Sequence, residues 1–338
     1  MKRIYIIISM LSFMFASCSG FLEEYSQDTA YVRGYEDLDE LLLGSVYMPT
    51  NAPEHMGYTY GTDGWYYPYI HLMTDEVQEN IRSSSSGALW DARERYFGYY
   101  TWQQQVGIDA LGTSIRKESS DWNRIYKHIN IANMILASID EQSTPKEEDE
   151  LEVMRIKGEA YFLRAYWHFD LLKKFGSIPV MDAFWDENAT IAGLQIPAKT
   201  RNEVARFILS DLVEAKNLLH SRGKYSGIRI NKEAAMVLAM NVALYEGTWE
   251  KYHSSDDFAS STNESNYFLG EVINWGNELF GCGIDLYKTG QNPGDAFAAL
   301  FNSKDLSGMG EVLLWRKYSS DEGVFHDVNG NLKAGVVD

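Results

Sequence analysis

Aromatic side chains are concentrated between residues 58 and 102, where their spacing fits neither a helix nor a strand throughout. Glycine and proline interrupt this stretch, and four consecutive serines precede Gly87. Such residues favour turns and loops, and loop aromatics on a rigid scaffold can form a binding surface. Most of these rings should still be core, because each buries about 150–250 Å² when packed. They are Tyr58, Tyr60, Trp65, Tyr66, Tyr67, Tyr69, Trp90, Tyr96, Phe97, Tyr99, Tyr100 and Trp102.

Three of these residues, Trp65, Tyr66 and Trp90, are our candidates for contacting a ligand. A glycine precedes the first two and the serine stretch precedes the third, so all three are expected beside flexible turns. Tyrosine and tryptophan combine a large apolar ring with one polar group, which suits a hydrated binding surface. Outside this stretch, Trp185 and Trp315 are weaker candidates.

Residues typical of catalytic or metal sites form no recognised pattern. The seven histidines are scattered, and the sequence lacks His-Glu-x-x-His, a cysteine pair at metal spacing, a P-loop and Gly-x-Ser-x-Gly. Asp75 and Glu76 could in principle act in glycoside hydrolysis, which uses two carboxylates flanking one bond. A helical scaffold gives them no evident second carboxylate, so we expect them to fix a turn or to hydrogen-bond a ligand. We therefore predict no catalytic residue, no metal ligand, no cofactor and no enzymatic activity.

The first 17 residues have the pattern of a secretory signal. Two basic residues precede an apolar stretch, Ile4 to Phe15, which is too short to span a bilayer. Two small residues and then Cys18 follow, which is similar to a bacterial lipobox with phenylalanine where leucine is usual. In the alternative, cleavage is ordinary and Cys18 is incidental. We favour lipidation of Cys18, because Cys282 is the only other cysteine and its apolar setting suggests a small buried side chain.

Length and composition indicate a globular protein of one or two domains. The chain has 338 residues, of which 45% are hydrophobic and 23% charged, enough to bury a large core. The formal net charge is −18, and an acidic surface repels phosphate backbones, so no nucleic-acid partner is expected.

One long helix is predicted at the centre of the chain, from Thr144 to Gly176. Thr144 suits the N-cap, Pro145 the first helical position and Glu147 a capping box, while Gly176 suits the left-handed residue that ends a helix. Apolar residues on two sides predict a helix packed between neighbours. They are Val153, Ile156, Ala160, Leu163, Trp167 and Leu171 on one side, and Phe162, Ala165, Phe169 and Leu172 on the other.

Two polar residues of this helix are expected to be structural. His168 lies between two aromatic residues and should be a packed histidine. Arg164 should form a buried or interfacial ion pair. We therefore expect this helix to hold the scaffold and not to bind the ligand.

Further helices are predicted over residues 35–47, 121–140, 201–219, 232–245 and 265–280. Thr200 and Glu203 form a second capping box, Asn231 can cap the following helix, and Gly247 should end it. Residues 311–315 could form a strand. The expected fold is mainly α, with tetratricopeptide-like helical hairpins and long irregular loops at about 50–118 and 176–199. The fit to that repeat is loose, since the period is not a steady 34 residues.

Several motifs together resemble one protein family. They are Cys18 followed by Phe-Leu, Met-Thr-Asp-Glu at 73–76, WNRIYKHINIAN at 122–133, GEAYFLRAYWHFDL at 158–171 and FGSIPV at 175–180. In this combination the chain resembles the SusD/RagB family of outer-membrane nutrient-binding lipoproteins. The resemblance covers essentially the whole chain, and the 158–180 block is its most specific part.

The resemblance implies one SusD-like domain over residues 18–338 after the signal peptide. It implies a lipid-anchored protein on the cell surface, at the outer membrane. Such proteins form a lid on a SusC-like TonB-dependent transporter and capture glycans, or sometimes peptides, for import. Family members commonly extend past this length, so we expect the C-terminal part of the ligand face to be incomplete.

Glycan capture would explain the aromatic residues in chemical terms. A sugar ring has an apolar C–H face, which an exposed Trp65, Tyr66 or Trp90 could cover, and a hydroxyl rim, which polar side chains could bind. Two alternatives are a peptide- or glycoprotein-binding RagB-like import protein and a helical scaffold lipoprotein that binds only proteins. The sequence does not name the ligand.

Overall fold

The structure is a computed structural model that describes residues 34–43, 121–141, 149–186, 195–290, 292–315 and 317. Its internal contacts divide the chain into two units, Met1–Gly34 and Tyr35–Asp338. All helices and strands named below belong to the second unit. None of the helices in the described ranges is both long and apolar enough to cross a membrane.

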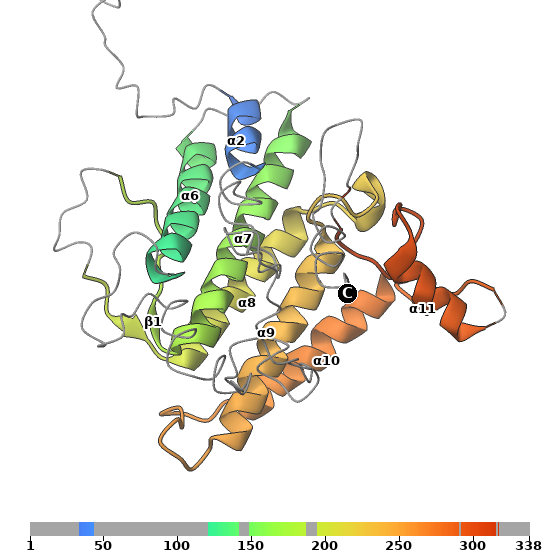
Figure 1. Ribbon diagram of the computed structural model, residues 1–338. Coiled ribbons are helices and arrows are strands. Elements are labelled where there is room, and N and C mark those ends of the chain that lie inside the picture. Colours follow the sequence, from blue (N-terminus) through green and yellow to red (C-terminus); the bar gives the residue numbers. More distant parts are fainter. Residues whose placement is uncertain are drawn as a thin grey trace, which may run out of the picture. The chain divides into compact units, whose positions relative to one another are not determined.

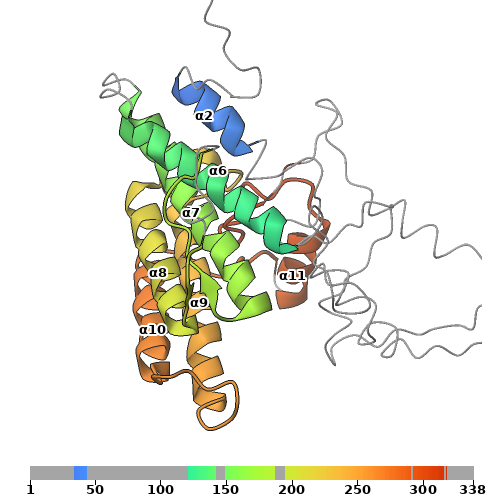
Figure 2. The ribbon, with the colours of Figure 1, turned by 90° about the vertical axis from the view of Figure 1, so that its left-hand side faces the viewer.

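Helices stack on one another in chain order. The strongest contacts join α6 (Asp121–Glu141), α7 (Glu150–Phe175), α8 (Arg201–Leu218), α9 (Lys232–Tyr252) and α10 (Ser265–Gly281), each with the next. Successive helices run in opposite directions (Figure 1). Figure 2 shows α8 and α10 on one side of the stack and α7 and α9 on the other. This arrangement confirms the predicted mainly α, tetratricopeptide-like fold.

Helix α7 is packed between neighbours on two sides, as predicted. It contacts α6 and α8 along its length, and also α2 (Tyr35–Leu41) and α9. All the apolar residues predicted for its two sides are buried, except that Val153 is half-buried. Burying a side chain such as Leu163 or Phe162 contributes roughly 1.5–3 kcal/mol, so packing on both sides holds this helix in place.

The predicted C-terminal end of α7 is confirmed, and the predicted N-terminal end is not. The helix ends as predicted at Gly176, whose φ is +74° and whose N–H donates to the Leu172 carbonyl at 3.0 Å. Its predicted start is wrong, because α7 begins at Glu150 after Asp149. Thr144, Pro145 and Glu147 lie outside the described residues.

A short pair of strands interrupts the predicted loop over residues 176–199. β1 (Ile178–Pro179) pairs antiparallel with β2 (Ala198–Lys199), with Ile178 opposite Lys199. Two residues per strand are too few to leave a periodic pattern, so this pairing was not predicted. β2 leads directly into α8, where the predicted capping box is confirmed: the Thr200 N–H donates to the Glu203 carboxylate at 2.9 Å.

Helix α9 starts as predicted and ends later than predicted. The Asn231 side chain accepts from the Ala234 N–H at 3.0 Å. The predicted end at Gly247 is wrong, because α9 continues to Tyr252. A Cβ built on Gly247 would lie 3.0 Å from Leu269 of α10. This glycine therefore allows two helices to approach closely and does not terminate one.

The segment after α10 also differs from prediction. Cys282 is exposed rather than buried, because it follows the last turn of α10 beyond the buried Leu279. Helix α11 (Pro293–Asn302) was not predicted, although Asn292 caps it by accepting from the Gly294 N–H at 3.0 Å. Residues 311–315 do not form a strand. Their backbone carbonyls instead accept from Arg222 of η3 (Arg222–Tyr225) and from Asn231, the N-cap of α9.

Candidate functional site

The residues predicted to bind ligand or lipid lie outside the described residues. They are Trp65, Tyr66, Trp90 and Cys18, and the acidic pair Asp75 and Glu76 does so as well. Their roles therefore stay predictions. What the structure does provide is the scaffold that would carry them, and the polar and aromatic sites of that scaffold.

The two weaker aromatic candidates are half-buried, and both lie in segments that are hydrogen-bonded to distant parts of the chain. Trp185 donates its backbone N–H to Asn130 Oδ1 at 2.9 Å, and its carbonyl accepts from Asn130 Nδ2 at 2.9 Å. Trp315 donates its indole N–H to the Ser226 carbonyl at 2.9 Å. Trp185 is therefore fixed through its backbone, and Trp315 through its indole N–H.

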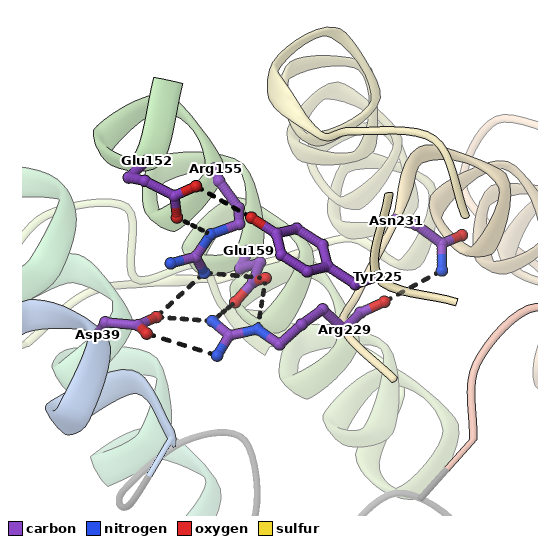
Figure 3. Close-up of polar contacts among 7 residues, drawn as sticks. All are labelled: Asp39, Glu152, Arg155, Glu159, Tyr225, Arg229 and Asn231. Atoms are coloured by element: carbon purple, nitrogen blue, oxygen red, sulfur yellow. Dashed lines mark hydrogen bonds and ion pairs between the residues drawn. The ribbon is translucent and has the colours of Figure 1, made fainter. Parts of the chain in front are cut away.

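Four charged side chains form a closed ring between α2, α7 and the segment before α9 (Figure 3). Arg155 Nη1 lies 3.0 Å from Asp39 and 3.2 Å from Glu159. Arg229 Nη2 lies 2.6 Å from each of the same two carboxylates. We call Asp39, Arg155, Glu159 and Arg229 the charge ring. Each carboxylate in it faces two guanidinium groups.

Neighbouring polar groups form further hydrogen bonds with the residues of the charge ring. Arg155 Nε lies 2.8 Å from Glu152, and the Tyr225 hydroxyl donates to the same carboxylate at 3.0 Å. Burial by itself raises the pKa of Asp39, but hydrogen bonds from Arg229 and Arg155 outweigh it and lower that pKa below its ordinary value. Asp39 is thus held as a paired carboxylate, whereas burial raises the pKa of Glu159 above its ordinary value even beside two arginines. Since both acids contact both arginines, the charge ring attaches α2 to α7.

The two polar residues predicted to be structural in α7 are confirmed as such. Arg164 binds the buried Asp211 of α8 through two nitrogens, at 2.8 and 2.7 Å, and also donates to Asn133 of α6 at 2.8 Å. His168 is fully buried, and its Nδ1 donates to the Arg164 carbonyl at 2.8 Å. Its Nε2 accepts from the Met181 N–H at 3.3 Å. Burial lowers the pKa of His168 to about 3, so the ring is neutral.

A surface pocket of about 440 Å³ opens where α7 ends and α8 begins. Its walls are residues 173–177, Thr200 and Arg201, Trp249 of α9, and residues 257–261 of the loop between α9 and α10. A second pocket of about 280 Å³ shares Thr200 and Ser261 and continues past Asn202 and Arg206 to Glu264. We call the two together the α8 groove.

Aromatic rings form one wall of the α8 groove. The Arg201 guanidinium lies 4.1 Å from the centroid of Trp249, and its Nη2 is 2.8 Å from the buried Glu246. His253 also packs against Trp249, with ring centroids 4.3 Å apart. Phe258 packs edge-on against Trp249 and remains 63% exposed. Phe258 thus offers an open ring face, while Trp249 serves as its support.

Hydrogen bonds fix the loop that carries Phe258. The Asp256 carboxylate accepts from the Phe258 N–H at 2.9 Å and contacts His253 Nδ1 at 2.6 Å. Farther along, Asn263 donates to the Glu250 carbonyl at 2.8 Å, and Asn202 of α8 donates to the Thr262 carbonyl at 3.1 Å. The loop is therefore tied to both α8 and α9.

The charges along the α8 groove are mostly paired. Lys173 and Lys174 both contact Asp170, at 3.6 and 3.0 Å, and Arg201 is paired with Glu246. In contrast, the exposed Asp257 carboxylate has no hydrogen bond or ion pair within the described part of the chain. The described residues also contain no group of three acidic, histidine or cysteine side chains that could hold a metal ion.

Sequence reasoning missed the α8 groove. Its walls come from four segments that are far apart in the chain, and only folding brings them together. The one local signal was the combination of an aromatic residue with polar neighbours, Asp257-Phe258-Ala259-Ser260-Ser261. That pattern is common in ordinary surface loops, so it indicates nothing by itself.

Comparisons with known proteins all find SusD-like proteins. A model of the SusD-like family, described as starch-binding and associating with the outer membrane, matches residues 69–244. Two proteins of Formosa agariphila, SusD-like protein P2 and SusD-like protein P38, are each 27% identical over 49% and 50% of this chain. The matched segments span 32% and 34% of those relatives, so this chain matches about a third of their length.

Solved structures support the fold. A SusD-like carbohydrate binding protein from Bacteroides vulgatus aligns over 85% of this chain and 51% of its own, with a TM-score of 0.52 and 18% identity. A SusD superfamily protein from Bacteroides thetaiotaomicron aligns over 84% of this chain and 55% of its own, with a TM-score of 0.51 and 14% identity. At such low identity the likeness concerns the helical architecture alone.

Proposed function

Because the chain belongs to the SusD-like family, we propose that it is a cell-surface lipoprotein that binds glycans and delivers them to a SusC-like TonB-dependent transporter. The observation that carries this proposal is the family match over residues 69–244, which is more than half of the chain. The family description names starch binding and association with the outer membrane. In our proposal, acyl chains on Cys18 supply the anchor.

The ligand platforms in this proposal are Trp65, Tyr66 and Trp90. Trp90 lies within the matched range, and the other two come just before it. If each ring stacked on a sugar contributes about 0.5–1.5 kcal/mol, two or three rings with hydrogen bonds to the rim give about 4–7 kcal/mol in total. That corresponds to dissociation constants from about 1 mM to about 10 μM. Weak binding suits a protein that must release its cargo to a transporter.

We further infer that the protein binds without turning over its ligand. The family is described by what it binds, and the sequence lacks the motifs of hydrolases. Release of reducing sugar from any retained polysaccharide by the purified protein would contradict this inference.

Affinity electrophoresis tests the proposal directly. The purified protein is run through native gels that contain starch, laminarin or xyloglucan, beside a gel without polysaccharide. We expect at least one polysaccharide to retard the protein, and we expect the triple variant Trp65→Ala, Tyr66→Ala and Trp90→Ala to migrate faster in that gel. If no glycan retards the wild type while peptides bind it, the peptide-import alternative replaces glycan capture.

The transporter partnership needs a separate experiment. Tagged protein is purified from detergent-solubilised membranes of the source bacterium, and co-purifying proteins are identified by mass spectrometry. We expect a SusC-like TonB-dependent transporter in stoichiometric amount. A protein that purifies without a transporter, yet still binds glycan, would contradict the delivery step and leave glycan binding in place.

A further inference from the structure

The α8 groove combines features that recur in carbohydrate sites. Its larger pocket, about 440 Å³, falls within the usual range for small-ligand sites, roughly 300–1,000 Å³. One ring at its mouth, Phe258, is 63% exposed and lies on a loop that is tied to two helices. A fixed, exposed aromatic face beside hydroxyl-bearing side chains can take the apolar face of a sugar.

We propose that the α8 groove is a second binding site for a neutral polysaccharide chain, separate from the aromatic stretch at residues 58–102. The inference rests on the proposed glycan-binding function and adds a site and a ligand class to it. In this site Phe258 covers the C–H face of a sugar ring. Asp257 and Ser261 bind hydroxyl groups of the same ring or of its neighbour.

The charges of the groove argue for a neutral sugar. Arg201 is paired with Glu246 and Arg206 with Glu264, while Lys173 and Lys174 share the single carboxylate of Asp170. The two lysines thus carry one positive charge more than Asp170, which offsets the Asp257 carboxylate, and the groove carries little net charge. Among the charged residues that line the groove, Asp257 has no hydrogen bond or ion pair within the described part of the chain. A carboxylate accepts hydrogen bonds from hydroxyl groups and repels the carboxylate or sulfate of an acidic sugar.

The shape of the groove argues for a chain of sugars and not a single sugar. The second pocket shares Thr200 and Ser261 with the first and extends by about 280 Å³ along α8. A polymer can therefore pass from Phe258 along the start of α8 toward Arg206 and Glu264, which are held together at 2.8 Å. Two sites on one protein also raise the effective affinity for a long polymer without any new contact.

Single substitutions in the groove test the proposal. Phe258→Ala removes the platform, and Asp257→Asn removes the charge but keeps the shape. Phe280→Ala is the matched control, because Phe280 is 69% exposed on α10 and does not line the groove. All three positions are exposed, and thermal melting followed by circular dichroism checks that each variant folds. Retardation is measured in gels with starch, laminarin, xyloglucan and, as the acidic polymer, polygalacturonate.

We expect Phe258→Ala to weaken binding to the retarding neutral polysaccharide by about 2- to 10-fold, the range for one lost aromatic contact. Phe280→Ala should have no effect. Asp257→Asn should weaken binding to neutral polymers. This variant should still bind the neutral polymers more tightly than it binds polygalacturonate. Adding Phe258→Ala to the triple variant of the aromatic stretch should remove binding that the triple variant retains.

Three outcomes would overturn the proposal, and they are distinguishable. If the wild type is retarded and Phe258→Ala and Asp257→Asn match it, the groove is not a glycan site and the proposed function stands. If polygalacturonate retards the wild type more than neutral polymers do, the assignment to neutral sugars is wrong. If no polysaccharide retards the wild type, the proposed function fails and this inference fails with it.

Discussion

Arg164 is the residue whose loss should damage the fold most among the polar residues of α7. It holds Asp211 through two nitrogens, and both side chains are buried. In Arg164→Leu, the Asp211 carboxyl would remain buried without its partner, which costs about 3–5 kcal/mol of unfolding free energy. Urea unfolding followed by circular dichroism measures this loss.

The matched comparison is an ion pair on the surface of the same helix. Lys157 lies 2.5 Å from Asp140, but the Asp140 side chain is 61% exposed. Lys157→Ala should therefore change the unfolding free energy by less than about 1 kcal/mol. Similar losses in the two variants would show that burial does not set the strength of these pairs.

His168 should make the fold sensitive to mild acid. Its pKa is about 3 when folded and about 6.5 when unfolded, so between these values the unfolded chain binds one more proton. Stability must then fall as the pH drops through that window, by about 1.4 kcal/mol per pH unit for this group. His168→Gln keeps a donor and an acceptor but cannot take up the proton.

The difference between the wild type and His168→Gln isolates this effect. Between pH 7.5 and pH 5, the wild type should lose about 2 kcal/mol more unfolding free energy than the variant. Acids with lowered pKa values, such as Asp39, lose their contribution at lower pH and affect both proteins alike. Parallel urea titrations at each pH measure the slopes, and equal slopes would mean that His168 is not buried as a neutral ring.

At the scale of helices, two glycines should respond oppositely to the same substitution. A Cβ on Gly247 of α9 would meet Leu269 at 3.0 Å, whereas a Cβ on Gly270 of α10 meets nothing within 4 Å. Alanine favours a helix over glycine by about 1 kcal/mol, but overpacking costs about 1–3 kcal/mol. Gly247→Ala should therefore lower the melting temperature, and Gly270→Ala should raise it.

Features set by neighbouring residues could be predicted from the sequence. The capping box of Thr200 and Glu203 and the Asn231 cap each depend on residues three positions apart, and both are present. The glycine that ends α7 was likewise predicted from local residue types. Gly247 has the same local signal but lies inside α9, because the packing of α10 against it decides what a glycine does there.

Features set by distant residues could not be predicted. Residues 311–315 have the composition of a strand, but Arg222 donates to the Val312 carbonyl at 2.9 Å and Asn231 donates to the Leu313 carbonyl at 2.8 Å. These side chains take the carbonyls that a partner strand would need. The α8 groove is a stronger case of the same kind, since its walls come from four separate segments.

At the scale of the whole molecule, the two cysteines make the anchoring proposal testable. Cys18 follows a signal-like segment, whereas Cys282 is an exposed free thiol after α10. Each buried CH₂ of an acyl chain contributes about 0.8 kcal/mol, so two or three chains on one cysteine hold a protein on a membrane stably where one chain would not. Cys18→Ala should therefore move the protein from the membrane fraction to the soluble fraction, and Cys282→Ala should leave it in the membrane fraction. Ultracentrifugation and immunoblotting measure the distribution, and a Cys18→Ala protein that stays with the membranes would show that something other than acylation of this residue holds it there.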